Sequence, residues 1–95
     1  MIPKAMDSLD VVEMVLFVEE LFETNIRDQE AESFGSPAEI VDWLELHVSN
    51  QRPGKHAIAF LKGLAEAHQN PELAEGLEQP WRREQIAAII RQIVQ

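Results

Sequence analysis

The chain has 95 residues, enough for one domain with a small core, and a formal net charge of −9. It contains no cysteine, which excludes disulfides, thiolate metal sites and a cysteine nucleophile. Its apolar runs are too short to span a membrane, and its first residues lack the apolar stretch of a secretory signal. We therefore expect a cytoplasmic protein that does not insert into a membrane.

The charge is unevenly distributed along the chain. Residues 1–50 hold 12 acidic side chains against two basic ones, giving −10, whereas residues 51–95 hold 5 against 6, giving +1. This negative field disfavours nucleic acid, whose phosphates would be repelled, and favours basic protein partners. Acidic surfaces also keep small proteins soluble, so composition alone leaves both interpretations open.

Residues 8–23 predict an amphipathic helix. Asp7 and Ser8 are favourable N-cap residues, because a side-chain oxygen can accept from a free amide of the first turn. Helical spacing places an apolar stripe for the core on one face: Val11, Met14, Val15, Val18 and Phe22. The opposite face mixes leucines with acids: Leu9, Glu13, Leu16 and Glu20. A mixed face of this kind indicates a docking surface beside a serine hydroxyl.

The rest of the chain is also predicted to be helical. Ile26 is expected to be a buried anchor in the loop after the first helix, and Asp28 is suited to cap a helical turn. Ser36 and Pro37 are typical of an N-cap followed by a first helical position. Further helices are predicted over residues 29–33, 37–48, 55–68, 72–77 and 81–94. No strand pattern is evident, so the fold class is all-α, a small helical bundle.

Three of these helices have apolar residues at helical spacing, and in the helix 55–68 they are Ile58, Leu61, Leu64 and Ala65. In the helix 37–48 the stripe is Ile40, Val41, Leu44 and Val48, and in the helix 81–94 it is Ile86, Ile89, Ile90 and Ile93.

The stretch Asp7-Ser8-Leu9-Asp10 and its helix resemble the modification site and second helix of acyl carrier proteins. The similarity continues through residues 19–22, 26–32 and 38–44, so it covers about residues 5–48. One departure is Ala5, where the family usually has glycine.

The resemblance implies that Ser8, flanked by Asp7 and Leu9, carries a 4′-phosphopantetheine arm. The terminal thiol of that arm would hold an acyl group as a thioester for fatty-acid, polyketide or similar biosynthesis. The implied partners are a phosphopantetheinyl transferase and acyl-transferring enzymes with basic docking patches, so the chain itself is not an enzyme. The residues implied to contact these partners are Asp10, Glu13, Leu16, Glu19, Glu20 and Ile26.

The resemblance also leaves a helix missing, because the family has a helix before the serine and only seven residues precede Ser8. The family's first helix has apolar residues at relative positions 0, 3, 4 and 8, which here match Ile86, Ile89, Ile90 and Val94. We therefore expect one domain, residues 1–95, with a carrier-like core (5–50) and a C-terminal extension (55–95) that packs on it. Three interpretations remain open: the last helix replaces the first by circular permutation, is an added helix, or is exchanged between two chains.

The same residues are also compatible with other functions. Ser8 could be an N-cap and nothing more, in an unmodified carrier-like interaction module or in a regulatory helical domain unrelated to carriers. The acids of the first helix face solvent and lack a partner group for acid–base catalysis.

The histidines, the tryptophans and the pair of adjacent arginines are predicted to have structural roles and not to form a functional site. The three histidines, His47, His56 and His68, are too scattered for a metal motif. Trp43 and Trp81 are expected to be packing residues. Arg82 and Arg83 are expected to hold an acidic patch of the same chain.

Overall fold

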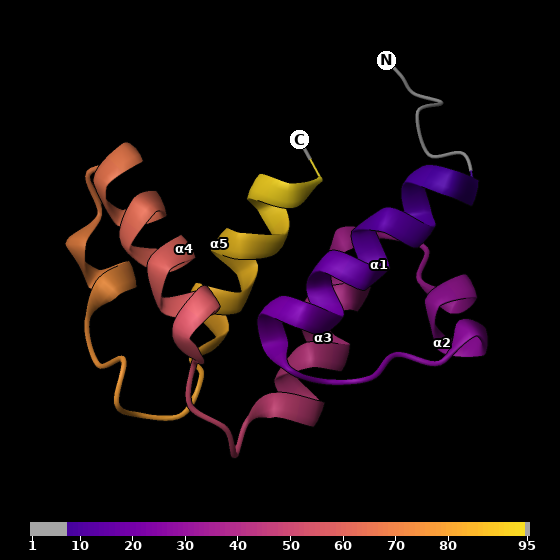
Figure 1. The fold of residues 1–95 in the computed structure, drawn as a ribbon, viewed down its shortest axis with the longest axis horizontal. Coiled ribbons are helices and arrows are strands. Elements are labelled where there is room, and N and C mark those ends of the chain that lie inside the picture. The colour runs from indigo at the N-terminus through magenta and orange to yellow at the C-terminus, as the bar shows by residue number, and fades with distance from the viewer. Residues whose placement is uncertain (1–7, 95) are drawn as a thin grey trace.

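The structure is a computed structural model that describes residues 8–94, with side chains described from residue 13 onward. All of its regular elements are helical, so the predicted all-α bundle is confirmed (Figure 1). In chain order the elements are α1 (Ser8–Phe22), α2 (Asp28–Ser33), α3 (Pro37–Val48), α4 (Lys55–Ala67), the 3-10 turn η1 (Pro71–Ala74) and α5 (Arg83–Ile93).

The predicted helix boundaries agree with the structure to within one residue from α1 to α4, and less closely after α4. α1, α3 and α4 begin where predicted, although the Ser36 side chain makes no capping hydrogen bond. The predicted helix 72–77 is shorter than expected, because only the 3-10 turn η1 forms and it ends at Ala74. The backbone then turns at Gly76, whose φ of 64° is a left-handed value that favours glycine. Trp81 lies before α5 because its N–H donates to the backbone carbonyl of Gln51 at 2.9 Å.

Gln51 fixes how three helices run relative to one another. Its backbone carbonyl accepts from Trp81, and its side-chain amide donates to the backbone carbonyl of Phe22 at 3.3 Å. The last turns of α1 and α3 therefore lie beside the beginning of α5. At the other end, Val94 lies near Met14 and Ile40, since all three line one pocket. α5 thus runs opposite to α1 and α3 (Figure 1).

One hydrophobic core joins α1, α3, α4 and α5. The predicted stripe of α3 is entirely buried, and Trp81 stacks obliquely on Phe22 with ring centroids 4.6 Å apart. On α1 the core side chains are Val18, Leu21 and Phe22, with Met14 and Val15 half-buried; Leu21 was not predicted, and the side chain of Val11 lies outside the description. α5 packs against α3 and α4 and buries three isoleucines completely: Ile86, Ile89 and Ile90. α5 therefore belongs to the same core as α1, α3 and α4.

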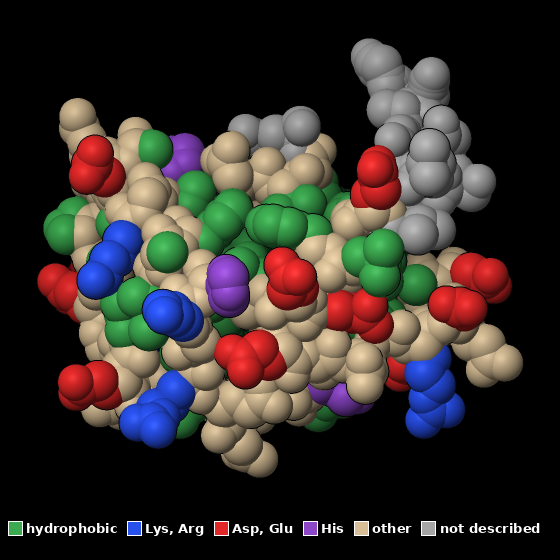
Figure 2. All heavy atoms as spheres, viewed as in Figure 1, with side chains coloured by type: hydrophobic (Ala, Val, Ile, Leu, Met, Phe, Trp, Pro, Cys, Tyr) green, Lys and Arg blue, Asp and Glu red, His purple; other side chains and the backbone are tan. Residues whose placement is uncertain are grey.

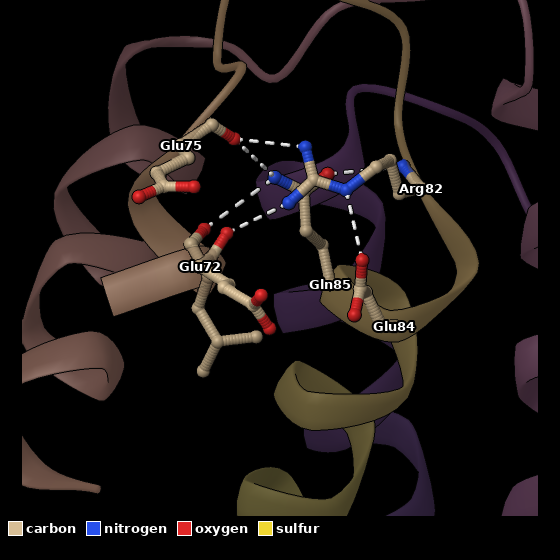
Figure 3. Close-up of polar contacts among 6 residues, drawn as sticks. Glu72, Glu75, Arg82, Glu84 and Gln85 are labelled. Carbon is tan, nitrogen blue, oxygen red and sulfur yellow. Dashed lines mark hydrogen bonds and ion pairs between the residues drawn. The ribbon is translucent and has the colours of Figure 1, made fainter. Parts of the chain in front are cut away.

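A polar cluster fastens the turn η1 to the beginning of α5 (Figure 3). The guanidinium of Arg82 donates to the backbone carbonyls of Glu72 and Glu75, at 2.7 and 2.9 Å, and pairs with the carboxylate of Glu84 at 3.0 Å. Gln85 is fully buried, and its side-chain oxygen accepts from the backbone N–H of Arg82 at 2.9 Å. Its side-chain nitrogen faces the carbonyls of Leu73 and Glu75, at 3.4 and 3.5 Å.

Arg83 joins α5 to α3 by ion pairs with Asp42 at 2.8 Å and Glu45 at 2.7 Å. The carboxylates of these two partners raise the pKa of Arg83 above its ordinary value. The expectation that this arginine holds acids of its own chain is confirmed. Arg82 does so through Glu84, but its other partners are carbonyls and not carboxylates.

Candidate functional site

Helix α1 begins at Ser8, the residue predicted to carry the arm. The amides of the first turn of a helix have no partner within it, so that end favours a negative charge. Leu9 and Asp10 belong to the same first turn, and their side chains, like that of Ser8, lie outside the description. Asp7 precedes the described residues altogether.

The outer face of α1 is exposed where the sequence predicted a docking surface. Glu13, Leu16 and Glu20 are all exposed, and the Leu16 side chain retains 59% of its accessible surface. Phe17, with 39% exposed, lies on the same side and was missed. Its position four residues after Glu13 and three before Glu20 is the helical spacing that could have revealed it.

Two of the predicted partner contacts serve the fold instead. Ile26 is only 6% exposed and packs in the core, which confirms it as a buried anchor and corrects its assignment as a surface contact. Glu19 is half-buried, and its carboxylate accepts the backbone N–H of Ile26 at 2.7 Å. The chain leaves helical geometry after α1, so this amide needs an acceptor that the helix cannot supply.

An apolar pocket of about 290 Å³ lies beside α1. Met14 lines it from α1, Phe34 from the end of α2, Ile40 from α3 and Val94 from the end of α5. Met14 is six residues after Ser8, about 9 Å along the helix axis at 1.5 Å per residue. The lining suits an apolar group, because few polar side chains reach it.

Helix α2 borders this pocket, and one side-chain hydrogen bond joins it to α3. None of its residues is fully buried. The indole N–H of Trp43 donates to the Glu30 carboxylate at 3.0 Å, and this bond lowers the pKa of Glu30 below its ordinary value. The backbone N–H of Arg27, 3.2 Å away, lowers it further.

Within the described part of the chain, no group of three or more His, Asp or Glu side chains could hold a metal ion. The ring of His47 stacks on Trp43 with centroids 3.8 Å apart. None of the described helices is both long enough and apolar enough to cross a membrane.

No protein-family model matches the chain, and no solved structure matches it. The likeness to acyl carrier proteins therefore rests on the residues of the sequence itself.

Proposed function

We propose that this chain is a cytoplasmic acyl carrier protein, with 4′-phosphopantetheine attached to Ser8. The observation that carries the proposal is the motif Asp7-Ser8-Leu9-Asp10, with Ser8 as the first residue of a helix whose outer face is acidic and exposed. In the attachment step the Ser8 hydroxyl loses its proton and bonds to the phosphorus of coenzyme A that bears the pantetheine arm. The nucleotide part leaves, and a phosphodiester remains on the serine.

The exposed face of α1 supplies the partner surface in this proposal. A transferase or acyl-transferring enzyme with Lys and Arg around its active site would meet Glu13 and Glu20, and an apolar residue beside them would meet Leu16. The apolar pocket beside Met14 gives the carried acyl group a place apart from water.

The same proposal assigns α5 to the place that the first helix holds in acyl carrier proteins. Its support is the burial of Ile86, Ile89 and Ile90 in the core that also contains Val18 and Ile40. Val94, the fourth residue of the matched pattern, is partly exposed and lines the pocket instead.

Intact mass after co-expression with a broad-specificity phosphopantetheinyl transferase tests the proposal. The wild-type chain should gain the mass of one arm, and Ser8→Ala should gain nothing while keeping its helical circular dichroism. Ser49→Ala, which changes another serine outside the motif, is the matched control and should gain the arm. An unmodified wild-type chain, or a modified Ser8→Ala chain, would contradict the proposal.

The alternative is a carrier-like interaction module that is never modified. The exposed Leu16 and Phe17 side chains favour it, because a partner can use them whether or not Ser8 bears an arm. A chain that resists every transferase but still binds a partner through this face would identify such a module.

A further inference from the structure

The exposed seam between α1 and α4 is formed by two aromatic rings. Phe17 of α1 and Phe60 of α4 lie with ring centroids 5.8 Å apart and planes inclined by 60°. Phe17 is well exposed and Phe60 is half-buried. Figure 2 shows apolar side chains gathering between α4 and α1, with carboxylates over α1.

Beside Phe60, helix α4 presents small side chains and one larger one, His56, which is exposed and lies one turn before Phe60. Gly63 and Ala67 are exposed and fall on the Phe60 side of α4 by helical spacing, and the exposed Ala59 lies one turn before Gly63. A Cβ atom added to Gly63 would have no atom within 4 Å, so nothing in this chain requires glycine there. Glycine is less favourable than alanine inside a helix, so the fold alone does not account for its presence. The absence of a side chain at Gly63 lets the backbone of another helix come close to α4 at this point.

The α1 side of the seam carries negative charge. Glu13 and Glu20 are exposed on either side of Phe17. Among the residues that the structure describes, no Lys or Arg forms an ion pair with either carboxylate. A binding partner is therefore able to supply the opposite charges.

We propose that the Phe17–Phe60 surface, made of these two rings, Ala59, Gly63, Ala67, Glu13 and Glu20, binds an amphipathic basic helix of a partner protein. The apolar stripe of that helix would cover the two phenylalanines, and its backbone would approach α4 at Gly63. Lysines or arginines along one flank would face Glu13 and Glu20. A second copy of this chain fits the charge less well, since each copy has a net charge of −9.

This inference does not depend on modification of Ser8, so it is tested on the full chain with Ser8→Ala. The probe is a fluorescently labelled synthetic helical peptide with leucines at helical spacing and lysines on one flank, and fluorescence anisotropy at low salt measures its binding. The same peptide with glutamates in place of the lysines serves as the charge control.

Gly63→Leu is the decisive variant, because a Cβ atom at this position meets no atom of the fold within 4 Å and the larger side chain projects into the open space beside Phe60. It should weaken binding of the lysine peptide by about tenfold or more, as expected for blocking the centre of an interface. Lys62→Leu adds the same side chain at an exposed position on another face of α4 and should leave binding intact. Replacing Glu13 and Glu20 by Gln should weaken binding and reduce its dependence on salt.

Three outcomes would overturn the proposal. The first is absence of binding by the lysine peptide, or equal binding by the glutamate peptide. The second is binding that Gly63→Leu leaves unchanged although thermal melts show a folded variant. The third is sedimentation showing self-association that Gly63→Leu abolishes, which would make a second copy the occupant of the surface. None of these results bears on whether Ser8 carries an arm.

Discussion

The side chain of Glu30 links helix α2 to helix α3. Its carboxylate accepts the indole N–H of Trp43, which joins α2 to α3, and the bond is the main cause of its lowered pKa. A carboxyl group whose pKa is lower in the folded chain than in the unfolded chain stabilises the fold above the unfolded pKa. That contribution is lost as the pH falls through the folded pKa.

We therefore expect the Trp43 indole proton to report on Glu30 in acid. Its NMR signal should titrate with a midpoint below the ordinary glutamate pKa, because the ionised carboxylate is the better acceptor. In Glu30→Gln the same signal should not titrate in this range. A Trp43 signal that shifts equally in both chains, or only above the ordinary glutamate pKa, would show that Glu30 does not hold the indole.

Gln85 is the only fully buried polar side chain in the described core, and it holds the beginning of α5. Gln85→Leu should keep the volume but leave the Arg82 N–H without its acceptor, which lowers the free energy of unfolding by about 1–3 kcal/mol. Denaturant unfolding measures this loss. Gln92→Leu, an exposed position on the same helix, is the control and should stay within about 0.5 kcal/mol of wild type. Equal stability of the two variants would contradict the capping role.

At the scale of elements, helix α5 covers the apolar faces of α3 and α4 and shields them from solvent. Ile90→Ala should leave a cavity in the core and lower the free energy of unfolding by about 2–5 kcal/mol. Val94→Ala, at the exposed end of the same segment, should cost much less. Thermal and denaturant melts measure both, and a small loss for Ile90→Ala would show that α5 is only an appendage.

Truncation and dilution extend this test to the whole helix. Removal of residues 79–95 should abolish the cooperative melt, since the core faces of α3 and α4 would be exposed.

In the described structure α5 packs within its own chain, so the melting temperature of the full chain should not depend on concentration. A melting temperature that falls on dilution would instead indicate helices exchanged between two chains.

At the scale of the whole molecule, the uneven charge distribution should govern how a transferase finds Ser8. Glu13→Lys combined with Glu20→Lys should slow attachment of the arm strongly at low salt, and the effect should shrink as salt screens the charges. Surface changes of this kind should alter folding stability by only about 0.5 kcal/mol. The kinetics of the mass gain provide the measurement.

The matched control places the same charge change elsewhere. Glu75→Lys with Glu78→Lys alters the exposed loop before α5 and should slow attachment far less. Equal slowing by both pairs would mean that net charge, and not the outer face of α1, guides the transferase.

The sequence alone determined the features that arise from local interactions. Helical periodicity and the residue types typical of helix starts were enough to predict where α1, α3 and α4 begin and to identify the buried stripe of α3, because each depends on residues within a few turns. The exposed positions of Glu13, Leu16 and Glu20 followed from the same periodicity.

Only the tertiary structure decided features that depend on residues far apart in the sequence. Glu19 binds the Ile26 amide because the chain turns back beside α1, and Gln85 is buried because η1 folds over the beginning of α5. Phe17 meets Phe60 only because α4 packs beside α1. Periodicity gives the direction in which a side chain points from its own helix. What it meets there depends on which other helix is packed against it, and that is set by burial of the whole core.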